Sequence, residues 1–484
     1  MKSSFIILLI IPMFLFMGCK NDDDDNNNNN DPNLTVADYT NYTIKAWGTN
    51  QADDFAGAVS DGAGNIIFAG ASEPDGYAGN IFLVKTNFST GNVAWTKVFD
   101  AGDQDRFPSP AENGQSQGGG GSRCLDIDGS GNLYIAGSSK QGFNEAFVVK
   151  IDANGSVVWE KFWEADASGL ARGSAKAYAI DEKDGKVYVT GATGGGDATE
   201  EAKIFLLVLN SETGEIDEST LLGIDPSAGY NDRGYVVRVS DDNSIYLAGW
   251  QGQGNSGFLM KFSSDLTFLW YEKINLGVGA RITDLDFDSS GNIYLAADLR
   301  GVSTYLGILK MDTDGNLIWG KQYQGESNDR NNISCLRVID GSLYAGGRGS
   351  FANYDTGLFG DACLLKMDLS GNLQKVYNYY TGPKSEDVCG ERVEAIFKYN
   401  GKLYLAGEAW PEYTTIKGSW YMPVGNITDL LPSVTKTTTM TIDTANGVFA
   451  TRNFSVSSIS QNLFDPADGT KGSADILIHE ITEE

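Results

Sequence analysis

Histidine, cysteine and proline are scarce in this chain of 484 residues, which has one His, five Cys and 11 Pro. Because His479 is the single histidine, we expect neither histidine acid–base pairs nor a His-rich metal site unless this residue is itself central. No cysteines are adjacent or arranged as Cys-X-X-Cys, so the zinc and redox motifs of that type are missing. Because proline is scarce, we expect the turns to be formed mainly by Asn, Asp and the 59 glycines.

Positive charge is also in short supply, since 36 Lys and Arg stand against 64 Asp and Glu, a net charge of −28. Proteins that bind nucleic acid cluster Lys and Arg against phosphates, so we expect no nucleic-acid partner. The acidic excess suits a soluble domain and would permit cation binding. Two Asp-x-Asp-Gly turns lack the closing Glu of a calcium loop, and we therefore predict no metal site.

The one long apolar run lies at the start of the chain, where Phe5 to Met17 follows a short basic segment. It is too short to span a bilayer as a mature helix. The run ends in Gly18-Cys19 and so resembles a bacterial lipoprotein signal, in which cleavage precedes a cysteine that carries diacylglycerol and palmitate. Phe16 and Met17 stand where the preferred pattern has Leu and a small residue. The alternative is an ordinary secretory signal with an incidental cysteine.

An Asp- and Asn-rich segment follows Cys19 and cannot bury apolar area. We expect a signal peptide over 1–18, a lipidated Cys19 with a disordered tether over 19–40, and a folded domain over 41–484. The acidic run also resembles the export signal of surface lipoproteins in Bacteroidetes-type bacteria. That resemblance implies a lipid anchor in the outer membrane, with the domain exposed at the cell surface. A solvated spacer is the alternative interpretation.

A short phrase recurs along the chain: a tight turn, then a strand that ends in Ala-Gly. It reads Gly-Asn-Ile-Ile-Phe-Ala-Gly at 64–70 and Gly-Asn-Leu-Tyr-Ile-Ala-Gly at 131–137. Variants end at residues 191, 249, 297, 347 and 407, and a degenerate copy runs from 447 to 453. Repetition at near-regular spacing indicates one supersecondary unit copied many times.

Each phrase has three neighbouring strands. An apolar strand with Lys follows it, as at 147–150, and then an Asp-x-x-Gly turn leads to a strand with Trp, as at 152–159. Another short strand precedes the phrase, as at 124–127. Four short strands per unit, without helical periodicity, predict an all-β fold, a single β-propeller of four-stranded blades.

The number of blades follows from the last, weak copy. Thr439–Asp443, Val448–Arg452 and Ala474–His479 would form three strands of an eighth blade, and Tyr42–Trp47 would supply its outer strand. Strands from both chain ends would then close the ring and remove the exposed sheet edge. We favour eight blades, with seven blades and a C-terminal appendage as the alternative.

The Gly-Asn-x-Tyr-x-Ala-Gly, Phe-x-x-Lys-x-Asp and Gly-Asn-x-x-Trp strands resemble the propeller repeats of bacterial cell-surface proteins and, more distantly, quinoprotein-like propellers. The resemblance covers nearly all of residues 42–480 and implies architecture only. A quinone-dependent dehydrogenase would be expected to have calcium ligands and, commonly, adjacent cysteines. Because this chain has no Cys-Cys pair, we expect no cofactor.

Candidate site residues lie in the long, variable connections, which share one face of the predicted ring. An acidic residue precedes Arg at several entries to inner strands: Asp105-Arg106, Asp232-Arg233, Asp329-Arg330 and Glu391-Arg392. These pairs could surround the channel mouth, or they could join neighbouring blades, and repetition across blades favours the second interpretation.

Aromatic residues on the same face are the stronger recognition candidates: Trp250, Trp410, Tyr413 and Tyr354. Flat rings beside carboxylates and amides suit stacking on a sugar or anchoring of a protein. In contrast, Trp95, Trp159, Trp270 and Trp319 recur in register, and we expect them to pack between blades. A Cys363–Cys389 disulfide on this face is a further prediction.

No residue set dictates a reaction, and we predict no catalytic residues, although an enzyme using Asp, Glu, Arg and Tyr remains open. We therefore expect a membrane-anchored binding or interaction module for a glycan or a protein. Two alternatives stay open: a scaffold subunit of an outer-membrane assembly, resembling the propeller lipoprotein of the barrel-insertion machinery, and a carboxylate-dependent polysaccharide hydrolase or lyase.

Overall fold

The computed structural model describes much of the chain: residues 35–38, 42–47, 52–73, 80–87, 90, 92–100, 104–108, 123–141, 143–165, 174–194, 202–224, 232–252, 255–276, 279–300, 305–323, 332–349, 361–381, 391–409, 416–422, 427–429, 433–437, 442–444, 447–450, 455–457 and 475–481. These residues form strands and turns and contain no helix. A membrane-spanning helix is accordingly not found among them.

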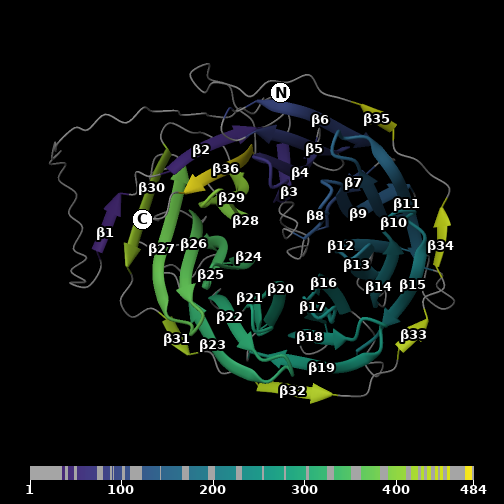
Figure 1. Ribbon diagram of the computed structural model, residues 1–484. Helices are drawn as coiled ribbons and strands as arrows, with labels where there is room; N and C mark the ends of the chain where they lie inside the picture. The colour runs from purple at the N-terminus through teal and green to yellow at the C-terminus, as the bar shows by residue number, and fades with distance from the viewer. Residues whose placement is uncertain are drawn as a thin grey trace.

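Seven antiparallel sheets stand around a central axis, and together they form an all-β propeller (Figure 1). Six sheets, here blades 1 to 6, follow one another along the chain, each built on four consecutive strands with a split first strand in blade 2. The seventh sheet, here the closing sheet, combines strands from both ends of the described chain. The repeated four-stranded unit predicted from the sequence is confirmed.

The first three blades have the following strands. Blade 1 comprises β3 (Ala52–Ser60), β4 (Asn65–Glu73), β5 (Asn80–Asn87) and β6 (Val93–Asp100). Blade 2 comprises β7 (Gln104–Arg106), β8 (Leu125–Ile127), β9 (Leu133–Gln141), β10 (Phe143–Ile151) and β11 (Val157–Ala165); β7 and β8 pair with different parts of β9 and together form the inner strand. Blade 3 comprises β12 (Ala175–Lys183), β13 (Lys186–Thr193), β14 (Ile204–Asn210) and β15 (Ile216–Leu222).

The remaining blades repeat the pattern. Blade 4 comprises β16 (Asp232–Val239), β17 (Ile245–Gln251), β18 (Ser256–Phe262) and β19 (Phe268–Asn275). Blade 5 comprises β20 (Gly279–Phe287), β21 (Ile293–Arg300), β22 (Tyr305–Met311) and β23 (Leu317–Tyr323). Blade 6 comprises β24 (Asn332–Ile339), β25 (Ser342–Gly349), β26 (Asp361–Asp368) and β27 (Leu373–Thr381).

The closing sheet has the order β2-β36-β29-β28, from β2 (Tyr42–Trp47), β36 (Asp475–Ile481), β29 (Lys402–Ala409) and β28 (Glu391–Tyr399). Tyr42–Trp47 is thus the outer strand, paired with β36. Eight blades are not found among the described residues. The expected third strand of the eighth blade, Ala474–His479, corresponds to β36, which lies between β29 and β2 in this seventh sheet.

The segment expected to form the rest of an eighth blade instead lines the outside of the ring. After β30 (Ile416–Met422) pairs with β27, the strands β31 (Ile427–Asp429), β32 (Ser433–Thr437), β33 (Ile442–Thr444), β34 (Gly447–Ala450) and β35 (Ser455–Ser457) add to blades 5, 4, 3, 2 and 1 in that order. We call residues 427–457 the strap (Figure 1). β1 (Thr35–Asp38) pairs with β30 at the rim of blade 6, so the segment expected as a disordered tether, 19–40, contains a strand near its end.

The repeated phrase has a packing reason, which Gly249 illustrates. Every inner strand except that of blade 2 contains a register shift near its middle, such as that between Gly234 and Val236. A Cβ at Gly249 would lie 2.0 Å from the carbonyl oxygen of Arg233 in this stretch. The final glycine of the phrase therefore lets the second strand approach the first at the bulge.

The tyrosine, lysine and tryptophan of the repeat form one interblade contact. In blade 2, Lys150 Nζ lies 5.2 Å from the ring centroid of Tyr134, and Tyr134 lies 6.2 Å from Trp159. Lys150 Nζ and Trp159 Nε1 both donate to the carbonyl oxygen of Ser211 in blade 3, at 2.9 and 3.0 Å. The same arrangement joins blade 1 to blade 2 at Ala153 and blade 5 to blade 6 at Leu369. The expectation that these tryptophans pack between blades is met at Trp95, Trp159 and Trp319.

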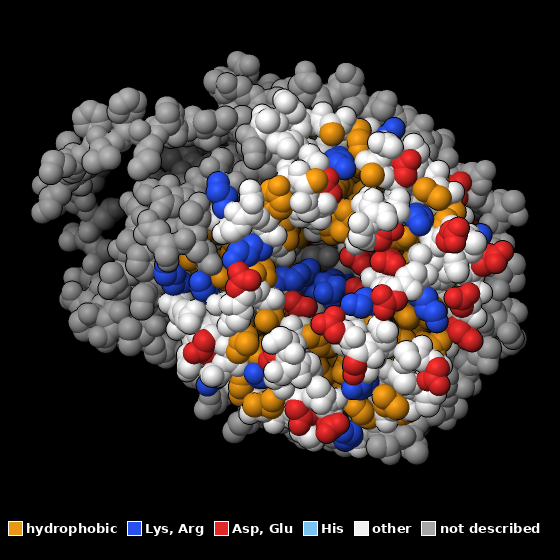
Figure 2. Space-filling model, viewed as in Figure 1, with side chains coloured by type: hydrophobic (Ala, Val, Ile, Leu, Met, Phe, Trp, Pro, Cys, Tyr) orange, Lys and Arg blue, Asp and Glu red, His pale blue; other side chains and the backbone are white. Residues whose placement is uncertain are grey.

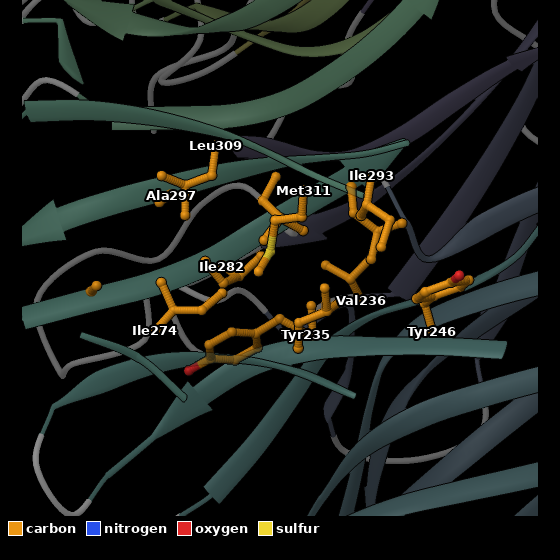
Figure 3. Close-up of a cluster of buried hydrophobic side chains, with 14 of the residues drawn as sticks. Tyr235, Val236, Tyr246, Ile274, Ile282, Ile293, Ala297, Leu309 and Met311 are labelled. Carbon is orange, nitrogen blue, oxygen red and sulfur yellow. The ribbon is translucent and has the colours of Figure 1, made fainter. Parts of the chain in front are cut away.

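Apolar side chains fill the space between neighbouring blades. One such cluster among the described residues centres on the boundary of blades 4 and 5 and includes Val236, Tyr246, Ile282, Leu309 and Met311, all at most 2% exposed (Figure 3). Burial of this kind is the main stabilising contribution to the fold.

Candidate functional site

The two ends of the ring differ in chemistry. One end carries the turns between first and second strands and between third and fourth strands, and we call it the short-turn face. There an aspartate accepts main-chain N–H groups: Asp128 Oδ1 binds those of Ser130 and Asn132, each at 2.9 Å. Asp152, Asp288, Asp312 and Asp368 repeat this pattern. These turns satisfy their own polar groups and offer little to a ligand.

The other end, here the loop face, carries the connections between blades and between second and third strands. Trp250 lies at this end of β17, half-buried, and packs against the cluster between blades 4 and 5. The guanidinium carbon of Arg233, on the same blade, lies 5.6 Å from the Trp250 ring, and that of Arg281, on blade 5, lies 5.1 Å away. Both distances are within the range of cation–π attraction. The ring is therefore held across a blade boundary.

Asn255 fixes the polar edge of the same ring. Its Oδ1 accepts a hydrogen bond from Trp250 Nε1 at 3.1 Å. Its main-chain oxygen accepts one from the N–H of Ala280 on blade 5, at 3.1 Å. A Cβ at Gly279 would lie 2.3 Å from Asn255 Nδ2, so glycine is needed where the Asn255 amide covers the start of β20. Trp250, Arg233, Arg281 and Asn255 thus form a preorganised cluster, here the Trp250 cluster.

Three of the four acid–arginine pairs, at 105–106, 232–233 and 391–392, lie at the beginnings of inner strands. Asp232 is 2% exposed, and its Oδ2 accepts the N–H of Ile224 at 3.0 Å. Asp105 is 1% exposed on β7. Arg392, at the start of β28, lies 3.4 Å from the carboxylate of Glu394 on the same strand. Arg392 therefore contacts its own strand, and the interblade interpretation of the pairs stays a prediction. Among the described pairs, Arg233 adjoins an aromatic candidate, Trp250.

Several predicted residues lie outside the described part of the chain. They are Cys19, Asp329, Arg330, Tyr354, Cys389, Trp410 and Tyr413, together with the side chains of Arg106 and Glu391. Cys363 is buried on β26 and is not part of a disulfide in this structure, so its pairing with Cys389 stays a prediction. Cys124 and Cys335 are buried thiols, and Cys124 Sγ donates to the carbonyl oxygen of Ala56 in blade 1 at 3.0 Å.

An ionic cluster that sequence reasoning missed joins inner strands around the centre of the ring. Arg123 Nε of blade 2 pairs with Asp284 Oδ1 of blade 5, and its Nη2 donates to the oxygen of Leu285 at 2.7 Å. Asp284 Oδ2 also accepts from Arg337 Nη1 and from the N–H of Leu336 in blade 6, each at 2.8 Å. Burial would raise the pKa of Asp284, but the two guanidiniums outweigh it and hold this pKa below its usual value.

The cluster continues around Arg238 of blade 4. Arg238 Nη1 lies 2.7 Å from Asp181 of blade 3, and Nη2 lies 3.4 Å from Asp286 of blade 5. Asp126 of blade 2 accepts the N–H of Glu182 at 2.6 Å. Burial and the neighbouring Asp181 raise the pKa of Asp126 to about 7. Figure 2 shows basic and acidic side chains gathered around the central opening.

The channel cluster connects five blades through paired charges, which indicates a role in holding the ring together. Its sequence signal was the Asp-Leu-Asp at 284–286 with Arg at 123, 238 and 337, but strand alternation alone does not say which inner-strand residues meet across a ring. Among the described residues, no group of three or more His, Cys, Asp or Glu could hold a metal ion.

No family model and no curated protein matches the chain. Solved structures do share its architecture at low similarity. The polysaccharide lyase Uly1 is 9% identical over 79% of this chain and 91% of its own, with a TM-score of 0.44. The quinohemoprotein alcohol dehydrogenase ADHIIG from Pseudomonas putida HK5 is 11% identical over 80% and 76%, with a TM-score of 0.41. An α-L-arabinofuranosidase from Clostridium thermocellum is 13% identical over 49% and 82%, with a TM-score of 0.29. Likenesses this distant carry no argument about activity, and the chain is described by its fold, an all-β propeller.

Proposed function

We propose that this chain is a lipid-anchored surface protein whose propeller binds a glycan through the loop face. The observation that carries the proposal is the Trp250 cluster: an indole held in place by two guanidiniums and an amide at the boundary of blades 4 and 5. A fixed aromatic ring with adjacent hydrogen-bonding groups suits stacking on a sugar, because little side-chain entropy is lost on binding.

The other surfaces support this choice by exclusion. The short-turn face uses its aspartates on its own main chain, and the channel charges are paired with each other. The loop face carries the variable connections and the predicted aromatic residues, where binding residues concentrate in folds with a rigid scaffold.

The anchor is part of the proposal. Cleavage before Cys19 would leave the lipid on a short acidic tether that ends at β1, on the rim of blade 6. The fifteen residues from 20 to 34 span at most about 50 Å when extended. An attachment at the rim rather than at either end of the ring leaves the loop face open to a ligand.

A polysaccharide hydrolase or lyase is the second candidate, favoured by one observation in the channel. Asp126 has a pKa raised to about 7 and lies in the electrostatic field of Asp181. Glycoside cleavage uses such a pair, in which one carboxyl group stays protonated near neutral pH and its neighbour is ionised. The contacts of Asp181 with Arg238 and of Asp126 with Glu182 are structural, so we rank this function lower.

The test is a polysaccharide-array screen of the chain from residue 33 onward, which keeps every described strand, with product analysis for each hit. Trp250→Ala and Trp410→Ala are expected to abolish binding, whereas Leu269→Ala, at a 40% exposed rim position of blade 4, should bind normally. Unchanged binding by Trp250→Ala would refute the assigned cluster.

Turnover by the unmodified chain that Asp126→Asn removes would establish the second function instead. Absence of any hit, together with no cell-surface exposure, would favour the third alternative, a scaffold subunit of an outer-membrane assembly. Protease accessibility on intact cells measures that exposure.

A further inference from the structure

The strap follows the ring in the direction opposite to the chain that built the blades. Its longest strand, β32, pairs with β19 of blade 4 over Tyr271 to Asn275, whereas β31, β33, β34 and β35 each pair over three or four residues. Short, separate strands of this kind have weakly specified register unless side chains select it.

Blade 4 differs from the other blades at the residue where the strap docks. Two residues after the tryptophan of the outer strand, blades 1, 2 and 5 have Lys97, Lys161 and Lys321. Their stems pack on the turn glycine of the next blade, and a Cβ at Gly155 would lie 2.8 Å from Lys97 Cε. Blade 4 has Glu272 at this position, with Cγ against Gly315 of blade 5.

The strap supplies the cation that blade 4 lacks. Lys436 of β32 is directly opposite Glu272 in the strand register. Its Nζ donates to the main-chain oxygen of Asp314 in the turn of blade 5 and lies 5.3 Å from the centroid of Trp270. Lys436 therefore bridges the outer strand of one blade and the turn of the next.

Glu272 makes this contact selective. The residue is 2% exposed, and a carboxylate so deeply buried is costly without a counter-charge. Its Oε2 has no hydrogen-bond partner among the described residues, and burial raises its pKa to about 7, while the positive charge of Lys436 acts in the opposite direction. Lys436 is the only Lys or Arg in the five strands of the strap. A slip of β32 by two residues would place Val434 or Thr438 across from Glu272, and no cation would then oppose the buried carboxylate.

Blade 5 carries the opposite charge pattern. Lys321 of β23 is paired in register with Asp429 of β31. In blade 3 the corresponding pair is neutral, Thr220 with Thr444. If the strap moved by one blade, Lys436 would meet Lys321, and like charges directly opposite destabilise a sheet.

We propose that the charge pair Glu272–Lys436 docks β32 on blade 4 in one register, and that Lys321 of blade 5 excludes the neighbouring position. The occupant of the outer edge of blade 4 is the chain's own strap. Specificity arises from attraction in the correct register and repulsion in the neighbouring one.

The test is hydrogen exchange of the full chain, read on peptides that cover 433–437. Lys436→Glu and Glu272→Lys are each expected to lower the protection of β32 at least tenfold, because like charges would then face each other. The double variant, with the charges exchanged, should recover at least half of that loss on a logarithmic scale.

Lys273→Glu is the matched control, since this next residue of β19 is paired with Thr435 and points to the other face of the sheet. It should leave β32 protected. Should a charge reversal prevent folding, Lys436→Met keeps the stem, removes the charge and is expected to lower protection severalfold. The proposal is overturned if the double variant is no better than its two components combined, if Lys436→Met exchanges like the unmodified chain, or if Lys273→Glu has the same effect as Lys436→Glu.

Discussion

Arg123 of blade 2 reaches across the central channel to Asp284 of blade 5, and the two side chains are 5% and 0% exposed. The pair joins blades that are not neighbours in the ring. Arg337 on blade 6 pairs with the same carboxylate. Burial, followed by the nearby positive charges of Arg238 and Arg337, lowers the pKa of Arg123 to about 10. Ion pairs of this kind stabilise the propeller from the centre as well as from its rim.

The first prediction concerns Asp284. Asp284→Asn would leave Arg123 and Arg337 buried without their counter-charge, and we expect a loss of about 3–5 kcal/mol in the free energy of unfolding. Urea titration measures it. Arg123→Met should cost less, because Asp284 keeps Arg337, and Asp217→Asn at the exposed rim should change nothing. Equal effects of Asp284→Asn and Asp217→Asn would contradict the assigned role.

The second prediction concerns pH. The folded-state pKa of Asp126, about 7, lies above its ordinary value of 3.8, so the folded chain holds this proton more tightly than the unfolded chain. Its contribution to stability is complete below about pH 4 and is lost as the pH rises towards 7. At pH 8 the free energy of unfolding of Asp126→Asn should therefore exceed that of the unmodified chain by at least about 1 kcal/mol, the equivalent of roughly one pKa unit. The two should converge at pH 4, and a gap that widens on acidification would contradict this assignment.

A third prediction tests the glycine of the repeated phrase. Gly249→Ala places a Cβ about 2 Å from the Arg233 carbonyl, so β16 or β17 must shift, with an expected loss of about 1–3 kcal/mol or more. Gly129→Ala is the control, since a Cβ there would meet nothing within 4 Å. Thermal denaturation compares them, and similar melting temperatures would mean that the bulge does not require glycine.

A fourth prediction tests the interblade contact of the repeat. Trp159→Phe keeps an aromatic ring but removes the Nε1–H that donates to Ser211 of blade 3. We expect a loss of more than about 1 kcal/mol, the sum of the hydrogen bond and of the packing that the larger indole makes on Gly214. Val158→Ala, at the preceding 51% exposed position, should be neutral. A loss as large for Val158→Ala would locate the effect in the strand rather than in the bond.

The fifth prediction is the Cys363–Cys389 disulfide. Peptide mapping without reduction should recover the two cysteines as one linked product. Alkylation under denaturing, non-reducing conditions should label Cys124 and Cys335 but neither member of the pair. Labelling of all four would exclude the bridge.

Much of the blade structure was predictable because its determinants are local. The Asp-x-x-Gly turns, the strand phrase and the in-register tryptophans each act within one blade or across one boundary, so spacing alone indicates them. The strap was not predictable in this way. Gly447–Ala450 matches the phrase but pairs with β11 of blade 2. The pairing partner of such a short strand depends on which sheet edge is available rather than on the residue pattern of the strand.

The candidate site divides along the same line. Trp250 and Arg233 were identifiable as loop-face residues, but their contact with Arg281 of the next blade was not. The four-stranded unit, its turns and its repeated interblade contacts follow from the sequence alone, because these residues contact others that lie in the same repeat or in the next one. Only the tertiary structure decided the number of sheets, the path of the strap and the meeting of Arg123 with Asp284, because those contacts join residues whose separation along the chain has no period.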